Sequence, residues 1–203
     1  MKRRTTVISA IAALALIGGG TATAVALSDD GTPSRSSVTV KDDGVSDAQE
    51  NANEAKGARI TAEDAIAAAL KHTPGVAAEA DLDSDDGRLV WDVDVIGSGA
   101  ARHHVEVDPG TGKVLGSHVE KDDDDDDPAR VAAALKNAST SASDAARVAA
   151  AKGTVTSVDA DDDGAVQVWE VETTSANGVE HDWHVDLRSG AVTVDRGHHG
   201  DDD

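Results

Sequence analysis

The stretch Trp91-Asp-Val-Asp-Val95 returns 78 positions later as Trp169-Glu-Val-Glu-Thr173. A turn sequence follows each copy: Asp108-Pro-Gly-Thr-Gly-Lys-Val114 after the first and Asp186-Leu-Arg-Ser-Gly-Ala-Val192 after the second, again 78 positions apart. The chain contains three Trp but no Phe and no Tyr, so two Trp in matching contexts indicate a duplication. The sequence therefore predicts two copies of one small domain.

Each copy predicts strands with one buried and one exposed face. Trp91, Val93 and Val95 alternate with Asp92 and Asp94, so the apolar side chains of an extended chain lie on one side. The ranges 103–108, 169–172 and 181–187 alternate in the same way. Such alternation is typical of antiparallel strands that pack one face on a core and expose the other to water.

A short helix is predicted before the strands of each copy. Thr61 and Asp64 fit a capping box at the first helix, and Ser141 and Asp144 fit one at the second, each followed by apolar residues at helical spacing. Residues 128–135, with a Pro at the first helical position, predict a further short helix.

The two copies differ in the spacing before the strand Trp. Gly87 precedes Trp91 by four positions, whereas Gly164 precedes Trp169 by five. One extra residue would turn every later side chain to the opposite face. The second copy is therefore predicted to carry a β-bulge near Gln167-Val168 or a longer turn.

Together these features resemble the PepSY domain. The shared features are a capped helix, an acidic turn, a W-x-V-x-V strand and a D-x-x-T-G turn. The first copy matches well, and the second is looser, with Ser189 in the position of the family's Thr. The signature positions are Trp91, Asp108, Thr111 and Gly112, and Trp169, Asp186, Ser189 and Gly190.

The resemblance implies an α+β fold of two small repeats, each with one helix packed on a three- to four-stranded antiparallel sheet (PepSY/cystatin-like). The family occurs in propeptides of secreted metallopeptidases and in exported bacterial proteins, where its proposed role is to inhibit or modulate peptidases. No catalytic residues belong to this module. The chain is thus identified as a tandem PepSY domain-containing exported bacterial protein.

Composition and charge runs place the expected boundaries. Residues 27–47 lack apolar periodicity, and the six Asp of 122–127 repel one another, so both segments are expected to lie outside the folded units. The expected organisation is a signal peptide or membrane anchor (1–26), a disordered linker (27–47), repeat 1 (48–121), an acidic linker (122–127), repeat 2 (128–197) and a polar tail (198–203).

The N-terminal segment predicts export. Lys2-Arg3-Arg4 precedes an apolar stretch and a small-x-small site at Ala24-Val25-Ala26, as in a cleaved signal peptide. The uncharged run 5–27 is also long enough to serve as an uncleaved transmembrane anchor, since about 20 residues suffice. Both interpretations place the rest of the chain in the cell envelope or outside the cell.

The net charge of −21 argues against nucleic-acid binding, which requires basic patches. The chain has no Cys, which excludes disulfides and thiolate metal sites. A nucleophile elbow and a zinc-protease motif are also absent from the sequence. We therefore expect no catalytic residues, no cofactor and no enzyme activity.

One pattern fits a calcium loop. Asp159, Asp161, Asp163 and Glu170 match D-x-[DN]-x-[DN]-G-x₅-E, and their oxygens could serve as calcium ligands. The flanking segments predict strands rather than helices, so the alternative is an acidic hairpin turn without a metal. No metal site is assigned on this pattern.

The histidines allow two interpretations. His103 and His181 occupy equivalent positions on the predicted apolar faces, where they are either rim residues beside the core or pH-sensitive binding positions. Neighbouring histidines, such as His181 and His184, point to opposite faces of a strand and cannot chelate one ion.

The expected function is non-enzymatic binding and modulation, by inhibition, of a secreted or cell-surface peptidase. The alternative is a divalent-cation, polycation or envelope-sensing interaction module. The expected partner is a secreted or membrane-associated peptidase or another envelope protein. The sequence leaves the oligomeric state open.

Overall fold

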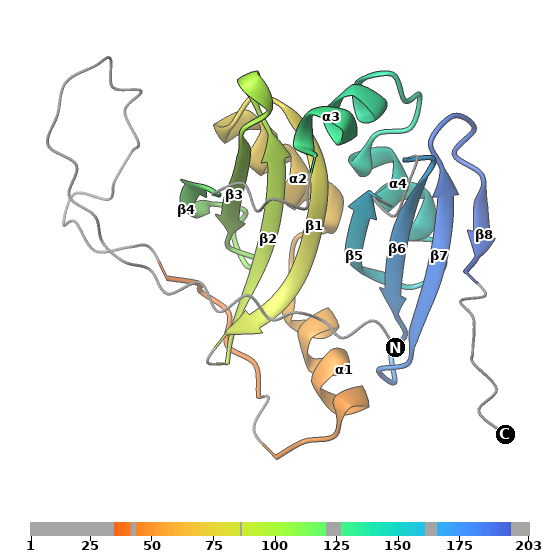
Figure 1. Ribbon diagram of the computed structural model, residues 1–203. Coiled ribbons are helices and arrows are strands. Elements are labelled where there is room, and N and C mark those ends of the chain that lie inside the picture. Colours follow the sequence, from red (N-terminus) through yellow and green to blue (C-terminus); the bar gives the residue numbers. More distant parts are fainter. Residues whose placement is uncertain (1–34, 42–43, 86, 121–126, 161–165, 196–203) are drawn as a thin grey trace, which may run out of the picture. The chain divides into compact units, whose positions relative to one another are not determined.

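The computed structural model describes residues 35–41, 44–85, 87–120, 127–160 and 166–195 (Figure 1). The helices are α1 (Asp47–Gly57), α2 (Ala62–His72), the short 3-10 turn η1 (Ser98–Ala100), α3 (Pro128–Lys136) and α4 (Ala142–Ala149). The strands are β1 (Val76–Asp85), β2 (Arg88–Ile96), β3 (Arg102–Val107), β4 (Val114–Val119), β5 (Thr154–Ala160), β6 (Val168–Thr174), β7 (Glu180–Asp186) and β8 (Val192–Val194).

All eight strands form one antiparallel sheet in the order β4-β3-β2-β1-β5-β6-β7-β8. The α+β class is confirmed, but the expected two separate small sheets are wrong. β1 of the first copy pairs with β5 of the second, and Ala80 faces Val158, its equivalent 78 positions later. The two copies are thus joined about a local twofold axis. The reason is that β1 and β5 would each be an open edge within their own copy. Pairing gives the backbone N–H and C=O groups of both strands hydrogen-bond partners.

The predicted alternation is confirmed, because it places the core on one face of this sheet. Trp91 and Trp169 are each 1% exposed, and both belong to one hydrophobic cluster with the apolar faces of α2 and α4. In Figure 1 these two helices lie behind the strands, and they also pack against each other. We call the opposite side of the sheet, which carries the acidic residues of the alternating strands, the outer face.

The helix starts are confirmed. Thr61 and Asp64 form the capping box of α2, and Ser141 and Asp144 form that of α4. Each box satisfies backbone groups that would otherwise lack partners in the first turn. α3 begins with Pro128, and the Asp127 side chain accepts a hydrogen bond from the Arg130 backbone N–H.

The bulge predicted near Gln167-Val168 is wrong. The pairs Val168–Asp186 and Trp169–Val185 follow one another without a shift. Leu82 faces Trp91, and Ala160 faces Trp169, so both hairpins join partners nine positions apart. The equal spacing shows that the second hairpin holds no extra residue between these pairs, and Gly164 itself lies outside the described residues.

Shifts in register occur elsewhere: one in β3–β4 of the first copy, between Glu106 and Val107, and one at an equivalent position in the first strand of each copy. β1 bulges at Ala78 and β5 at Thr156, 78 positions later. Both bulged residues are buried. The duplication thus includes an irregularity that the sequence pattern did not indicate.

Residues 35–41 form a strap that packs on the first copy, so the disordered linker expected over 27–47 is wrong for this part. The Val40 backbone N–H donates to the Gly87 carbonyl, and the Leu89 N–H donates to the Val38 carbonyl. Val38 is buried in the main hydrophobic cluster. The chain then enters α1, which the sequence analysis did not predict because its eleven residues are mostly polar.

Several expectations lie outside the described residues. They concern the export segment 1–26, residues 122–126 of the acidic linker and the polar tail 198–203. Within the described ranges, none of the helices has the length and apolar character needed to cross a bilayer.

Candidate functional site

The outer face of the first copy centres on His104. Its Nδ1 lies 3.1 Å from Asp94 Oδ1, and its Nε2 lies 3.1 Å from Asp92 Oδ1. Register explains the geometry, because His104 of β3 faces Asp94 of β2, and Asp92 lies two residues away on the same face. Arg102 Nη1 also contacts Asp94 Oδ2, at 3.2 Å. Two basic side chains thus lie against the buried Asp94, and one of them also reaches the half-buried Asp92.

This environment holds His104 in its charged form. Burial alone lowers the pKa of its imidazole, but the hydrogen bonds and charges of Asp92 and Asp94 outweigh burial and raise the pKa to about 10. A ring that donates from both nitrogens is an imidazolium. The group therefore acts as a fixed positive charge at neutral pH.

Two triads in this region are close enough to share a metal ion. They are Asp92, His104 and Glu106, and Asp94, His104 and Glu120, with ligand atoms within 4.8 Å of one another. Both triads use His104, which would have to lose a proton before it could bind a metal. The arrangement as it stands favours an ion-pair network.

Carboxylates also meet where the two copies join. Glu79 of β1 faces Asp159 of β5, and Asp81 lies next to Glu79 on the outer face. Burial, followed by the charge and hydrogen bond of Asp81, raises the pKa of Glu79, and Asp159 and Asp94 add to the rise. We call Glu79, Asp81 and Asp159 the seam carboxylates.

The structure tests only part of the calcium pattern. Asp159 and Glu170 face each other across β5 and β6. Asp161 and Asp163 lie outside the described residues. Within the described ranges, two of the four oxygen donors are therefore neighbours.

The signature turn of the first copy is a structural element. Asp108 accepts hydrogen bonds from the backbone N–H of Gly110 and Thr111, and from both the backbone N–H and the hydroxyl of Ser37 in the strap. Burial alone would raise the pKa of Asp108, but these hydrogen bonds lower it below its usual value. Gly112 takes a positive φ of 71°, which glycine adopts without strain.

In the second copy, the aspartate of the same turn is bonded by residues of its own turn, and no strap lies on it among the described residues. The Asp186 carboxylate accepts from the hydroxyl and backbone N–H of Ser189 and from the Arg188 N–H. These bonds lower the pKa of Asp186. Gly190 again has a positive φ, 67°. In the first copy, a Cβ at Gly110 would meet the strap, so the equivalent Arg188 is incompatible with a strap in the same position.

The two strand tryptophans are equally buried but differently bonded. Trp169 Nε1 donates to the Thr140 carbonyl at 3.0 Å. Trp91 Nε1 has no hydrogen-bond partner among the described residues. The third tryptophan, Trp183 of β7, is half-buried and donates to Thr173 Oγ1 at 2.9 Å.

The histidines lie on the faces predicted for them. His184 is on the outer face, with Nε2 3.6 Å from Asp195 Oδ2, and His181 lies on the other face beside the Trp183 ring. His103 is half-buried and close to Gly97, whereas its equivalent His181 is exposed. The rings of His103 and His104 lie on opposite faces of β3, and those of His181 and His184 lie on opposite faces of β7. Neither pair could therefore chelate one ion.

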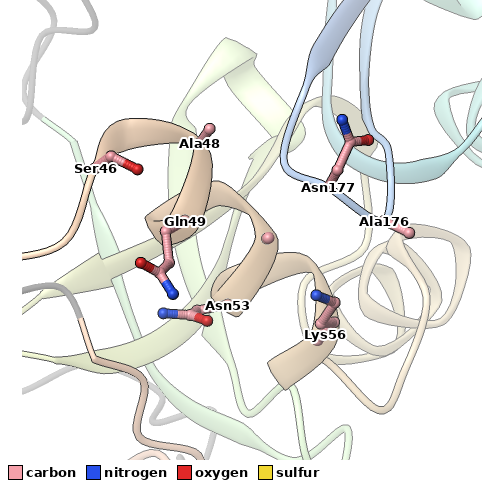
Figure 2. Close-up of a pocket in the computed structure, with 8 residues that line it drawn as sticks. Ser46, Ala48, Gln49, Asn53, Lys56, Ala176 and Asn177 are labelled. Atoms are coloured by element: carbon pink, nitrogen blue, oxygen red, sulfur yellow. The ribbon is translucent and has the colours of Figure 1, made fainter.

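Two grooves flank α1. Figure 2 shows the first, about 330 Å³, which is lined by one face of α1 with Gln49, Asn53 and Lys56 and by the β6–β7 loop with Asn177. The second, about 570 Å³, lies between Lys56 of α1 and Lys152 after α4. Both are open and shallow, and they bring no acid–base pair together among the residues that line them.

No sequence pattern predicted a role for His104, Arg102 or Glu79. Alternation placed His104 on the outer face with Asp92 and Asp94, but the contact depends on which residues face each other across two strands. A hairpin register counted from the connection 97–101 between β2 and β3 could have paired them. The role of Glu79 could not be predicted, because its neighbour Asp159 belongs to the other copy.

The comparison with protein families agrees with the duplication. The family described as "Peptidase propeptide and YPEB domain" (PepSY) matches residues 59–118 and 131–193. A crystal structure of a candidate lipoprotein from Clostridium difficile 630 is similar at 22% identity and a TM-score of 0.43, covering 67% of this chain and 91% of that one. None of the curated proteins matches the chain.

Proposed function

Because the chain belongs to the PepSY family, we propose that it is a non-enzymatic exported protein that binds and modulates a secreted or cell-surface peptidase. The observation that carries the proposal is the family match over both copies, which leaves little of the described fold for another domain. The positively charged N-terminal segment with its apolar stretch supports export. Inhibition is the expected form of modulation.

The architecture supports binding by docking. The outer face is acidic, and both ends of the sheet are open edges within the described residues. Edge strands can bind a partner by adding a strand from it. The net charge of −21 favours a partner with a basic surface, and association with such a partner slows as salt rises.

The second candidate is a divalent-cation, polycation or envelope-sensing module. The observation that favours it is the crowding of the seam carboxylates beside the facing pair Asp159 and Glu170. Carboxylate oxygens are ligands that calcium prefers.

The test of the first proposal is peptidase activity in the culture medium of the producing cells. Purified full-length chain is added at low and at physiological salt, and the rates of the secreted peptidases are compared with and without it. We expect one peptidase to slow and to co-purify with the chain, more strongly at low salt. If no peptidase changes its rate or co-purifies, peptidase modulation is wrong.

Calorimetry with calcium separates the second candidate from the first. Peptidase modulation without a metal predicts no saturable heat that depends on Asp159 or Glu170. A saturable site that is lost in both Asp159→Asn and Glu170→Gln would favour the cation-binding module.

A further inference from the structure

β8 presents backbone groups that can bind another strand. Asp186 N–H donates to the Ala191 carbonyl, and Asp195 N–H donates to the Asp182 carbonyl, which marks the hydrogen-bonded pairs between β7 and β8. In an antiparallel ladder, the residues between such pairs point their N–H and C=O away from the neighbouring strand. Those residues are Val192 and Val194. Within the described residues, no strand lies beyond them.

The apolar side of this edge is already shaped for a hydrophobic side chain. Val194 is 57% exposed and faces Trp183 across the β7–β8 pair. The Trp183 ring is held by its bond to Thr173, and Lys152 Nζ lies 5.1 Å from the ring centroid. The lysine disfavours a second cation on this side, so a residue added next to Val194 should be apolar.

The outer side of the same edge is acidic. Thr193 faces His184, and Asp195 continues the strand next to Asp182. Glu170 lies one strand further in, 3.9 Å from His184. Among the described residues, His184 is the one side chain of His, Lys or Arg that β6 to β8 place on the outer face, so a residue added next to Thr193 should be basic.

The opposite edge lacks this combination. In β4 the residues with outward backbone groups are Ser117 and Val119, because Glu120 N–H donates to the Arg102 carbonyl. His72 of α2 bonds to Ser117 at 3.0 Å and occupies the apolar side. The outer side near β4 carries the basic side chains Arg102, His104 and His118 among the carboxylates Glu106 and Glu120, so it is mixed in charge rather than acidic. A basic strand is therefore favoured at β8 over β4.

We propose that β8 binds an extended segment of a partner protein in which apolar residues alternate with Lys or Arg. The apolar residues pack beside Val194 and Trp183, and the basic residues meet Asp182, Asp195 and Glu170. The choice of occupant rests on charge complementarity and on the alternation of the two faces. The inference deepens the proposed docking function by naming the surface and the chemistry of the partner segment.

Synthetic peptides test this inference without any peptidase. The probe is a labelled peptide of alternating Lys and Val, and its binding to the full-length chain is followed by fluorescence anisotropy at low and at physiological salt. Controls are an alternating Glu and Val peptide and a peptide of the probe's composition with all Lys before all Val. We expect the probe alone to bind saturably, and more weakly as salt rises.

Two proline variants locate the site. Val194→Pro removes an outward N–H but leaves the bonds between β7 and β8 in place, so we expect binding to weaken about tenfold or more. Val119→Pro makes the same change at the β4 edge, where Val119 is also 57% exposed, and should leave binding unchanged. A probe with N-methylated backbone amides gives the same test on the unaltered protein, and it should not bind.

Each other outcome overturns the inference. Equal binding of the block-ordered peptide, or unchanged binding by Val194→Pro and by the N-methylated probe, would show attraction to the acidic surface without strand addition. A loss confined to Val119→Pro would place the site at β4, and an absence of probe binding would exclude the β8 site. Peptidase modulation through another surface could still be observed in the culture-medium experiment, so the two failures are distinguishable.

Discussion

The imidazole of His104 separates two carboxylates that would otherwise repel each other along β2. Asp92 and Asp94 are two positions apart and so point to the same face. The side chain of Asp94 is only 9% exposed, so its charge requires partners. His104 and Arg102 supply them from the neighbouring strand.

We expect His104→Ala to lower the free energy of unfolding by about 2–3 kcal/mol at about pH 6, because Asp94 loses a charged partner. The folded pKa of His104, about 10, lies above its unfolded value of 6.5. The stabilisation is therefore complete below about pH 6.5 and is lost as the pH rises toward 10. Urea unfolding of both proteins at about pH 6, 8 and 10 measures the difference.

His181→Ala is the control, because His181 is exposed and should show a small difference at every pH. A His104 effect that does not shrink between about pH 6 and 10 would contradict an imidazolium at this position.

The two signature aspartates should differ in their contribution to stability. Asp108 accepts four hydrogen bonds, two of them from Ser37, whereas the bonds of Asp186 come from its own turn. We expect Asp108→Ala to cost about 3 kcal/mol and Asp186→Ala to cost clearly less. Asp108→Ala should also release the strap, which limited proteolysis within residues 35–41 would detect. Equal losses, or a strap that stays protected, would contradict the structural role of Asp108.

At the scale of elements, local signals predicted what local interactions determine. The starts of two helices were predicted correctly from capping boxes, Thr61 with Asp64 and Ser141 with Asp144. A capping box involves residues only three positions apart. The alternation of apolar and polar residues predicted the faces of the strands for the same reason, because it depends only on residues that are neighbours in the sequence. The spacing from Gly164 to Trp169 did not predict an extra residue correctly, because the strand partners Leu82–Trp91 and Ala160–Trp169 are equally far apart in the two copies.

Elements that depend on distant contacts were not predicted. The strap binds Asp108, which is 71 positions from Ser37. α1 has no strong apolar stripe of its own, and it lies close to the β6–β7 loop of the second copy. Its position follows from tertiary contacts rather than from its own sequence.

Gly178 makes one of these contacts. Its φ is +80°, and a Cβ there would overlap the carbonyl oxygen of Ala48 in α1. We expect Gly178→Ala to cost about 3 kcal/mol, from backbone strain together with displacement of α1. Hydrogen exchange should then be faster in residues 47–57, while urea unfolding reports the total loss.

Gly99→Ala is the matched control. Gly99 also has a positive φ, 74°, but no atom lies within 4 Å of its Cβ position. That variant should lose only the strain energy, about 1–2 kcal/mol. The same loss in both variants, with unchanged exchange in α1, would show that the helix does not depend on the β6–β7 loop.

At the scale of the whole molecule, the sheet makes the two copies one structure. The strand pairing between them covers three residue pairs, centred on Ala80 and Val158. On the outer face, register connects His104, Asp94, Glu79, Asp159, Glu170 and His184 across six adjacent strands. Neither repeat alone contains this row, which explains why the analysis of a single copy could not predict it.

Within this row, carboxylates crowd most closely where the two copies join, at Glu79 and its neighbours Asp81 and Asp159. The substitution Glu79→Gln measures the repulsion between them. The pKa of Glu79 is raised, so keeping this group ionised costs stability as the pH rises above the unfolded value of about 4.5. Removing the charge should therefore increase the free energy of unfolding at neutral pH. We expect about 1 kcal/mol, because the side chain is 35% exposed and solvent screens part of the repulsion.

The gain from Glu79→Gln should shrink as the pH falls toward about 4.5, because the glutamate of the unaltered protein is then protonated in the unfolded chain as well as in the folded protein. High salt should reduce it as well, because screening weakens the repulsion from Asp81 and Asp159. Glu106→Gln makes the same substitution on the outer face of β3, away from the seam, and should give no such gain. A destabilised Glu79→Gln at neutral pH would show that this carboxylate acts as an ionised partner of Arg102, 4.0 Å away, rather than as a source of repulsion between the copies.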